Sequence, residues 1–291
     1  GTPLFSAGLI KKKGPLQHDL TWGQHGAASG ELYVPFGIAA DSEGNIYVAD
    51  TYNNRMQVFD SNGKYKRVWG KKGVATGDLY LPYDVDIDRD GNVYVADTYN
   101  FRVQKFDSLG RFLVSWGTKG KGNGEFAFLS GIAIGPDNAV YTTDAKMHRV
   151  QVFDSLGKYL RSWGRKGREH GNFAAPMGID VDSEGNVYVA DSKMRRVQVF
   201  DSQGNFLSLI EGNLIYPTDV AVDSASGYLY VLDGKGCNVW EMSLAGGDKK
   251  SLGGPGTGTA QFAKPYGICV DRGGNVFVAD SKNSRVQKLS H

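Results

Sequence analysis

Apolar and polar residues alternate along most of the chain, in short runs separated by turns that contain glycine. The segment from Pro35 to Asp60, PFGIAADSEGNIYVADTYNNRMQVFD, contains three such runs, joined by a DSEGN turn and a polar loop. Alternation with a period of two is typical of a strand with one buried face, and Asp, Asn, Ser and Gly favour tight turns. Each run is about five to seven residues long, an ordinary length for a strand. The pattern predicts an all-β protein.

The same unit recurs six times. Successive copies, aligned on a Pro-x-Gly or Pro-x-Asp tripeptide in which Leu129 once replaces proline, are 47, 47, 47, 41 and 48 residues apart. Each unit contains four strand-like runs, so we expect a four-stranded antiparallel sheet. One such sheet cannot bury both of its faces, whereas six sheets arranged radially bury each face against a neighbour. The sequence therefore predicts a six-bladed β-propeller with blades starting near residues 35, 82, 129, 176, 217 and 265.

We expect the two ends of the chain to share one blade. The unit that starts at Pro265 supplies only three strands before the chain ends at His291, and residues 16–23 (LQHDLTWG) can supply the fourth. Trp22 precedes Gly37 by the same fifteen residues that separate the equivalent tryptophan and strand start in the next unit. Residues 16–23 are therefore predicted to complete the last blade. Residues 1–15 are predicted to be an N-terminal extension of a single propeller domain, 1–291.

The repeated unit resembles the NHL repeat. The resemblance lies in the pattern Pro-x-Gly-Ile-Ala-x-Asp-x-x-Gly-Asn-Ile-Tyr-Val-Ala-Asp-x-x-Asn-x-Arg-x-Gln-Val-Phe, which begins here at Pro35, and it extends over about residues 16–291. It implies a six-bladed propeller. It also implies a range of functions, since proteins of this kind include RNA-binding proteins, an amidating lyase and bacterial extracellular or sensor domains. The fifth unit departs from the pattern, with Asn238 where the others have arginine.

Composition excludes few classes of function. The formal net charge of +2 does not by itself indicate a nucleic-acid or membrane partner. The longest apolar runs are far shorter than the roughly 20 residues of a membrane span, so we expect no membrane insertion. Cys237 and Cys269 lack the spacing of a zinc site and are interpreted as free thiols. We expect no cofactor and no metal centre.

Some recurrent residues are interpreted as structural because they occur once in almost every blade. An aspartate is followed by an arginine five positions later in five of the six units, as in Asp50 and Arg55, and we expect each pair to hold the loop between its second and third strands. The tryptophans at positions 22, 69, 116 and 163 are expected to anchor the packing of the outer strands.

The residues that vary between blades are predicted to share one face of the disc. In a propeller the loops between the second and third strands emerge on the same face as the connections between blades. We call this the basic face, because it carries thirteen lysines and arginines outside the recurrent pairs and only five acids. The cations are Lys71, Lys72, Lys119, Lys121, Lys146, Arg165, Lys166, Arg168, Lys193, Arg195, Lys235, Lys264 and Lys282. On the opposite face acids outnumber bases.

The basic face is the predicted binding site of a non-catalytic recognition module. Cations that alternate with aromatic residues suit single-stranded RNA or another anionic polymer, since phosphates pair with the cations and bases stack on the rings. A protein-binding or ligand-sensing propeller is the alternative use of this face, and we expect a monomer. The candidate residues in the loops and at the mouth of the channel are Phe36, Tyr52, Tyr83, Tyr99, Phe101, Lys146, His148, Met177, Lys193, Arg195, Lys235, Tyr266 and Lys282.

Two enzyme classes are less favoured. The resemblance to the amidating lyase implies a histidine after the proline of the first strand, and this chain has none at any of the six positions. His148 and His170 lack a placed third ligand for zinc. In calcium-dependent six-bladed lactonases carboxylates crowd the channel, as Asp84, Asp86, Asp180 and Asp219 could here. For Asp86 and Asp180 we instead expect hydrogen bonds within the channel wall.

Overall fold

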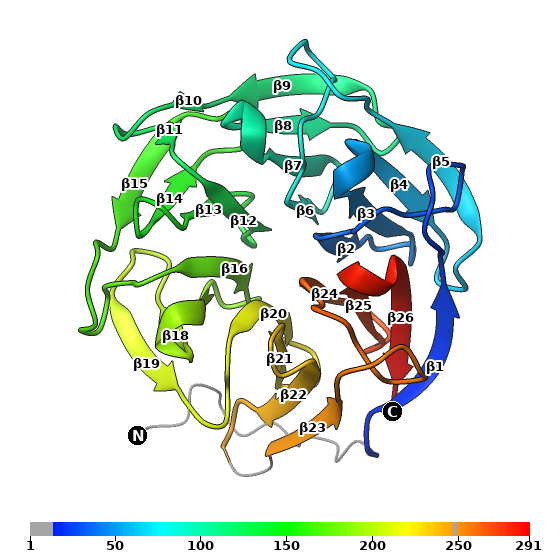
Figure 1. The fold of residues 1–291 in the computed structure, drawn as a ribbon. Helices are drawn as coiled ribbons and strands as arrows, with labels where there is room; N and C mark the ends of the chain where they lie inside the picture. Colours follow the sequence, from blue (N-terminus) through cyan, green and yellow to red (C-terminus); the bar gives the residue numbers. More distant parts are fainter. Residues whose placement is uncertain (1–13, 247–248) are drawn as a thin grey trace.

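The computed structural model describes residues 14–246 and 249–291 and shows six four-stranded antiparallel sheets around a central axis (Figure 1). The predicted six-bladed propeller is confirmed. The first thirteen residues of the predicted extension at 1–15 lie outside the described residues. No helix in the described part of the chain is long and apolar enough to cross a membrane.

Blades 1 to 5 run outward from the axis in chain order, and blade 6 ends with the N-terminal strand at its outer edge. The strands are, for blade 1, β2 (Ile38–Ala40), β3 (Ile46–Asp50), β4 (Arg55–Phe59) and β5 (Tyr65–Trp69); for blade 2, β6 (Asp84–Ile87), β7 (Val93–Asp97), β8 (Arg102–Phe106) and β9 (Phe112–Trp116); for blade 3, β12 (Leu129–Ile134), β13 (Val140–Asp144), β14 (Arg149–Phe153) and β15 (Tyr159–Trp163); for blade 4, β16 (Pro176–Val181), β17 (Val187–Asp191), β18 (Arg196–Phe200) and β19 (Phe206–Ile210); for blade 5, β20 (Pro217–Asp223), β21 (Tyr228–Asp233), β22 (Asn238–Ser243) and β23 (Lys249–Gly253); and for blade 6, β24 (Gly267–Val270), β25 (Val276–Asp280), β26 (Arg285–Ser290) and β1 (Gln17–Trp22).

Short elements occur in the connections. The 3-10 turns η1 (Thr51–Asn53), η2 (Thr98–Asn100), η3 (Ser192–Met194) and η4 (Ser281–Asn283) follow the second strands of blades 1, 2, 4 and 6, and β10 (Thr118–Lys119) pairs with β11 (Glu125–Phe126) between blades 2 and 3. The innermost strands of blades 1, 2 and 6 are shorter than expected, with three or four residues. In blade 1 the backbone pairing continues beyond β2 through the bond from Phe36 N to Ala49 O, outside the regular ladder.

The N-terminal strand closes the ring, as predicted. Strand β1 pairs antiparallel with β26, from Gln17 opposite Ser290 to Trp22 opposite Val286, with one bulge between His18 and Leu20. It is thus the outermost strand of the blade that contains the C-terminus (Figure 1). This arrangement gives the last blade the fourth strand that the C-terminal repeat lacks.

The hydrophobic core consists of six clusters that lie between neighbouring blades. The cluster between blades 1 and 2, for example, joins the fully buried Tyr47 and Val58 to Val95 and Phe106. The cluster between blades 6 and 1 joins Trp22 and Phe277 to strands β2, β3 and β4. Each sheet therefore buries both faces on its neighbours, which is the reason that a single four-stranded unit cannot fold alone.

The recurrent tryptophans anchor one blade on the next, as expected. Trp22 packs against Phe59 and Trp69 packs against Phe106, with ring centroids 6.1 and 5.9 Å apart. A side chain added at Gly63, in the β4–β5 turn of blade 1, would collide with the ring of Trp22 at 2.6 Å. Gly63 also has a φ of +78°, so this position needs glycine for two independent reasons.

The last residue of each second strand is an aspartate, and these six residues are called here the blade aspartates: Asp50, Asp97, Asp144, Asp191, Asp233 and Asp280. Asp50 is fully buried and pairs with Arg55 at 2.7 Å. The guanidinium of Arg55 also donates to the carbonyls of Ala27, Ala28 and Glu31. In blade 1 the pair thus holds its own loop, as the recurrence predicted, and also the incoming connection.

Two blades modify this arrangement. In blade 3, Arg149 donates to Gly122 O and Glu125 O, but its Nε finds no hydrogen-bond partner among the described residues. Asp144 instead accepts hydrogen bonds from the backbone N–H groups of Ala127 and Phe128. In blade 5, which lacks the arginine, Asp233 likewise accepts bonds from the backbone of the incoming connection.

Candidate functional site

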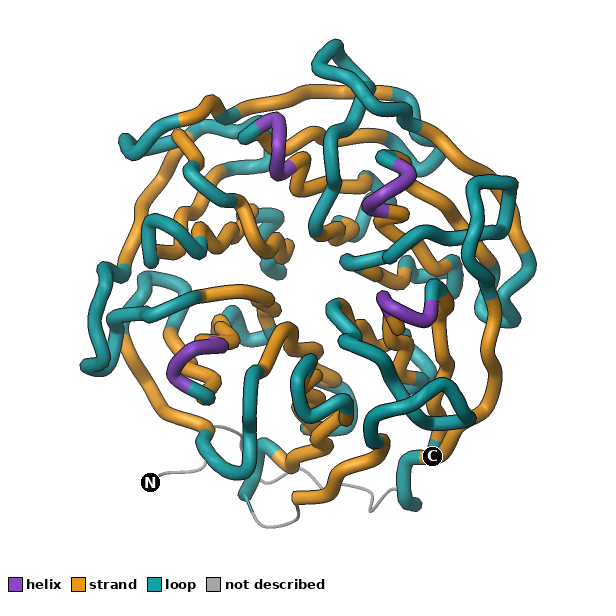
Figure 2. The backbone as a smooth tube through the Cα atoms, in the orientation of Figure 1, coloured by secondary structure: helices purple, strands orange, loops and turns teal. Residues whose placement is uncertain are grey.

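The loops between second and third strands lie on the same face as the connections between blades. In blade 1 the backbone N–H of Tyr52, in η1, donates to the carbonyl of Tyr33, in the incoming connection, at 3.1 Å. Blade 2 repeats the bond between Tyr99 and Tyr80 at 3.2 Å. The 3-10 turns and the connections are seen together from this side in Figure 2. This is the basic face of the sequence analysis.

Three aromatic rings cover the mouth of the channel on this face. Phe36 stacks on Tyr266 with centroids 4.2 Å apart, and Tyr83 packs edge-on against both rings, at 4.8 and 5.5 Å. All three are half-buried. Burial raises the pKa of Tyr83 to about 12 and raises that of Tyr266 well above its usual value, so both phenols are neutral at physiological pH. The rings form an apolar cap over the axis.

The other three positions of this ring offer little surface. Met177 is 8% exposed, Ser130 is 2% exposed and Thr218 is 5% exposed. The hydroxyl of Ser130 donates to Pro176 O at 3.0 Å, which ties blade 3 to blade 4. The predicted mouth residues therefore divide into an aromatic half, which lies on blades 1, 2 and 6, and a buried half.

A second ring surrounds the cap, at the loop position two residues after each blade aspartate. Tyr52 is 48% exposed and Tyr99 is 42% exposed, and the other four members are exposed lysines. We call these four the lysine arc, because they come from the consecutive blades 3, 4, 5 and 6: Lys146, Lys193, Lys235 and Lys282. The structure thus brings the predicted tyrosines and lysines to equivalent places on one face.

The remaining predicted residues end the same loops. Phe101, His148 and Arg195 all adopt the left-handed conformation, with φ near +57°. Arg195 is exposed beside the lysine arc. Phe101 is half-buried, and the ammonium of Lys119 lies 5.3 Å from the centre of its ring. The Nδ1 atom of the half-buried His148 has no hydrogen-bond partner among the described residues.

Sequence reasoning missed a set of aromatic residues in the incoming connections. Tyr33 and Tyr80 lie against Tyr52 and Tyr99, and Phe128 and Tyr216 lie beneath lysines of the arc, at 5.8 Å from Lys146 and 4.8 Å from Lys235. A spacing would have revealed Tyr33, Tyr80 and Tyr216, since each precedes its blade aspartate by seventeen residues. The contact that each of these aromatic residues makes depends on the side chain that the adjacent loop places against it.

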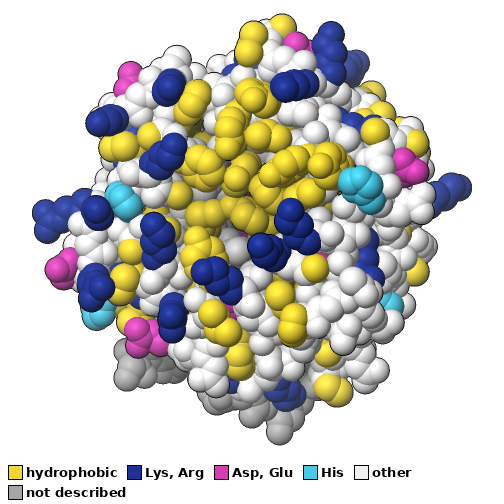
Figure 3. All heavy atoms as spheres, viewed as in Figure 1, with side chains coloured by type: hydrophobic (Ala, Val, Ile, Leu, Met, Phe, Trp, Pro, Cys, Tyr) yellow, Lys and Arg dark blue, Asp and Glu magenta, His cyan; other side chains and the backbone are white. Residues whose placement is uncertain are grey.

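On the surface, these residues form a central hydrophobic area and a surrounding zone of cations. Figure 3 shows a broad hydrophobic area over the centre of this face, with Lys and Arg side chains distributed around it and few Asp or Glu side chains. Among the described residues, one of the cations that define the basic face has a carboxylate within 4 Å: the Nζ of Lys71 lies 3.9 Å from Asp78, and the side chain of Lys71 is 81% exposed. The face is therefore both cationic and aromatic.

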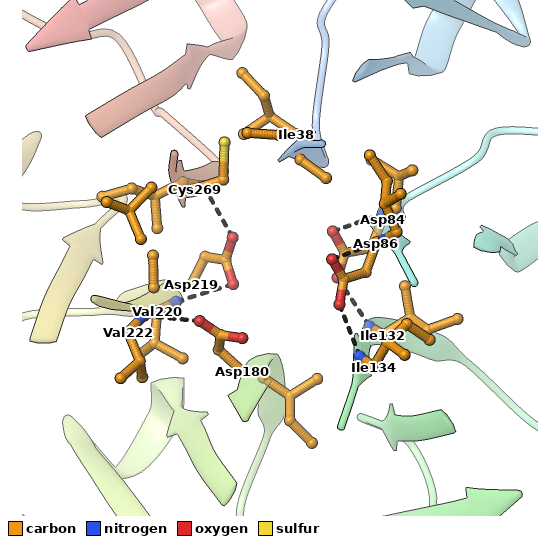
Figure 4. Close-up of a pocket in the computed structure, with 18 residues that line it drawn as sticks. Ile38, Asp84, Asp86, Ile132, Ile134, Asp180, Asp219, Val220, Val222 and Cys269 are labelled. Carbon is orange, nitrogen blue, oxygen red and sulfur yellow. Dashed lines mark hydrogen bonds between the residues drawn. The ribbon is translucent and has the colours of Figure 1, made fainter. Parts of the chain in front are cut away.

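Beneath the cap, a cavity of about 210 Å³ lies on the axis. Four carboxylates line it, with Asp84 and Asp86 on one side and Asp180 and Asp219 on the other (Figure 4). The rest of the wall is mainly Ile, Val and Ala side chains from the innermost strands. The aspartates predicted on the innermost strands therefore do meet in the channel.

Each carboxylate also joins two blades, as expected for Asp86 and Asp180. Asp86 accepts hydrogen bonds from its own neighbour Ile87 and from Ile134 of the next blade, at 2.8 and 2.7 Å. Asp180 does the same with Val181 and Val222. Equivalent bonds link Asp84 to Ile132 (Figure 4) and Asp219 to Ile268. The four side chains act as bridges within the channel wall.

Burial in the channel changes the acidity of these carboxyls. Desolvation raises the pKa of Asp84, Asp86 and Asp180 to about 7 and raises that of Asp219 well above its usual range, although the backbone N–H bonds oppose the shift. Within residues 14–246 and 249–291, no group of three His, Cys, Asp or Glu side chains is placed to hold a metal ion. His170 instead stacks on Phe206, with centroids 4.4 Å apart.

These features define a six-bladed β-propeller with a basic, aromatic loop face. The family model described as the SMP-30/Gluconolactonase/LRE-like region matches residues 77–231, and the NHL repeat model matches residues 32–59 and 262–289. The chain belongs to the SMP-30/gluconolactonase/LRE-like family and carries NHL repeats, which confirms the resemblance.

Similar curated proteins match over short segments. Protein lin-41 of Caenorhabditis elegans is 46% identical over 56 residues, 19% of this chain and 5% of that protein. Protein brain tumor of Drosophila melanogaster is 37% identical over 57 residues, 20% of this chain and 5% of that protein. E3 ubiquitin-protein ligase TRIM71 of Rattus norvegicus is 46% identical over 46 residues, 16% of this chain and 5% of that protein. The match spans only a small part of each of these longer relatives.

Solved structures share the architecture. A streptogramin B lyase structure superposes with a TM-score of 0.66 at 14% identity, over 95% of this chain and 97% of the other. A Bacteroides thetaiotaomicron protein of unknown function superposes with a TM-score of 0.72 at 17% identity, over 95% of this chain and 76% of the other. At these identities the likeness shows the propeller fold alone.

Proposed function

We propose that this propeller is a non-catalytic recognition module that binds single-stranded RNA through its basic face. The observation that carries the proposal is the lysine arc, in which four consecutive blades present an exposed lysine from the same loop position. A curved row of cations suits a phosphate backbone, which carries one negative charge per nucleotide. The exposed rings beside the arc provide the stacking surfaces that unpaired bases need.

The mouth of the channel also supports recognition rather than catalysis. Its six positions hold Phe36, Tyr83, Ser130, Met177, Thr218 and Tyr266, none of which has an imidazole, a carboxylate or a thiol. Below them, each channel aspartate already accepts two backbone hydrogen bonds. These four carboxyls thus serve to join blades as well as to line the cavity.

The test is binding of a labelled random pool of single-stranded RNA at several salt concentrations. We expect affinity to fall steeply as salt rises, because bound cations displace counterions from the phosphates. A variant in which Lys146, Lys193, Arg195 and Lys282 are all changed to glutamate is expected to lose binding. A matched control changes four exposed cations in turns of the opposite face, Lys64, Arg89, Lys158 and Arg272, to glutamate and is expected to bind like the native protein.

Two results would contradict the proposal. Absence of binding at low salt would exclude RNA as the ligand and would turn attention to a protein partner on the same face. Equal loss of binding in both charge-reversed variants would show that attraction depends on overall charge and not on the basic face.

A further inference from the structure

Two positions distinguish blades 1 and 2 from the other four. One lies seventeen residues before the blade aspartate, in the incoming connection, and the other lies two residues after it, in the loop. In chain order the six pairs are Tyr33 and Tyr52, Tyr80 and Tyr99, Ala127 and Lys146, Ala174 and Lys193, Tyr216 and Lys235, and Ala263 and Lys282. Only the first two blades place two tyrosines together.

The two tyrosine pairs have the same geometry. Their ring centroids are 5.3 Å apart in blade 1 and 5.4 Å apart in blade 2, and the planes are inclined by 55° in both. The same contacts hold the backbone of both pairs, since the N–H of the first tyrosine donates to the blade aspartate at 2.7 Å and its carbonyl accepts from the N–H of the second tyrosine. Rings that pack on each other above a backbone held in this way lose less conformational freedom when a ligand binds than rings on a free loop.

Both pairs remain accessible. Tyr33 is 40% exposed, and Tyr52 and Tyr99 are exposed to a similar extent. Tyr80 is half-buried, with the ammonium of Lys72 at 5.1 Å from its ring centre. His25 packs edge-on against Tyr33 at 4.7 Å. Each blade therefore offers an exposed ring supported from one side by a second ring, with a nitrogen-bearing side chain nearby.

We propose that the tyrosine pairs of blades 1 and 2 are two stacking sites for neighbouring unpaired bases, while the lysine arc of blades 3 to 6 holds the flanking phosphates. This inference rests on the proposed function and specifies its ligand as an RNA segment with at least two unstacked bases. Aromatic side chains bind any base through its π-face, so the sites favour single strands over duplexes and over polyanions without rings.

Two double variants separate stacking from charge. Tyr52→Leu with Tyr99→Leu removes the exposed rings but keeps apolar surface, whereas Tyr52→Phe with Tyr99→Phe keeps the rings. Stacking on an aromatic ring contributes roughly tenfold in affinity per base, so the leucine variant is expected to bind a twelve-nucleotide RNA about a hundredfold more weakly. The phenylalanine variant is expected to bind nearly as the native protein does, and inorganic polyphosphate is expected to bind all three equally.

A spectroscopic measurement locates the sites. Fluorescence of 2-aminopurine falls when the base stacks, so RNAs with this base at successive positions are expected to show quenching at two neighbouring positions, and the leucine variant is expected to abolish it. Circular dichroism and thermal melting check that each variant is folded.

Three outcomes would overturn the inference. Native affinity of the leucine variant for RNA, together with loss of binding in the variant with four glutamates on the basic face, would leave the proposed function standing and remove the stacking sites. If the leucine variant binds polyphosphate and RNA more weakly by the same factor, the tyrosines maintain the structure of the basic face and do not stack on bases. Failure of the native protein to bind RNA would remove both proposals.

Discussion

The ring of Phe36 stacks on the ring of Tyr266 with centroids 4.2 Å apart and planes inclined by only 18°. Phe36 belongs to the first blade and Tyr266 to the last, so the contact spans the interface between these two blades, whose hydrophobic core includes Trp22 of β1. Tyr83 of blade 2 packs against both rings. The cap therefore covers the channel and also joins three blades near the axis.

Truncation of the cap is expected to destabilise the propeller. Tyr266→Ala should lower the free energy of unfolding by about 3 kcal/mol, because it removes ring contacts with two other blades and leaves a void. Tyr266→Phe is the matched control, since the hydroxyl is buried without a hydrogen-bond partner among the described residues. We expect Tyr266→Phe to be neutral or stabilising in urea unfolding. Equal losses in both variants would show that the hydroxyl, and not the ring, is important.

Removal of the closing strand is expected to lower the melting temperature by many degrees. Deletion of residues 1–23 removes β1, leaves the edge of β26 unpaired and exposes the cluster that Trp22 covers. A synthetic peptide with the sequence of residues 14–23, added in excess, is expected to restore part of the loss by mass action. An unchanged melting temperature after the deletion would contradict closure by this strand.

The arginines that follow the blade aspartates are expected to differ in their effects. Arg102 pairs with the fully buried Asp97 at 2.7 Å, so Arg102→Ala leaves a buried carboxylate without its cation and should cost about 3 kcal/mol. Arg149→Ala should cost less, because Arg149 makes only two bonds to backbone carbonyls and its Nε has no partner among the described residues. Urea unfolding of both variants measures the difference. Equal losses would mean that the carbonyl bonds, and not the ion pair, stabilise these loops.

The channel carboxyls are expected to make stability depend on pH. The pKa values of Asp84, Asp86 and Asp180 are about 7 in the folded state against an ordinary 3.8. Between these values the folded state binds more protons than the unfolded chain. Their contribution to stability is therefore fully present below about pH 4, decreases as pH rises through 7 and levels off above it. We expect the melting temperature to fall between pH 5 and pH 8.

A pair of variants tests the origin of this slope. Asp86→Asn is expected to reduce the change in melting temperature between pH 5 and pH 8, since it removes one group that titrates in the window. Asp107→Asn is the control, because hydrogen bonds at its exposed turn lower the pKa of Asp107 and place its titration below the window. If Asp86→Asn leaves the change in melting temperature between pH 5 and pH 8 unaltered, other groups cause the pH dependence.

Much of the fold could be predicted because its signals are local. The period of the repeat, the DSEGN-type turns and the three-stranded last unit each lie within a short stretch of sequence, and together they predict the blade number and the closing strand. Blade 3 holds its loop differently from the others, because Asp144 accepts bonds from the incoming connection and Arg149 donates only to backbone carbonyls. Spacing alone did not distinguish these two arrangements.

The candidate site was predicted only in part. The charge of the loops predicted the basic face and its lysines, whereas Met177 proved to be buried and Tyr33 and Tyr80 were missed. Tyr33 precedes Tyr52 by nineteen residues, and the two rings meet because the connection and the loop are held by one aspartate, Asp50.

The sequence by itself determined that this protein is a closed six-bladed propeller with one cationic loop face, because alternation, turn chemistry and repeat length are properties of neighbouring residues. Only the tertiary structure decided which side chains meet. The stacking of Phe36 on Tyr266 and the bridging of blades by the channel aspartates depend on the radial arrangement of the sheets. That arrangement brings residues from distant repeats to one axis, where burial then changes their acidity.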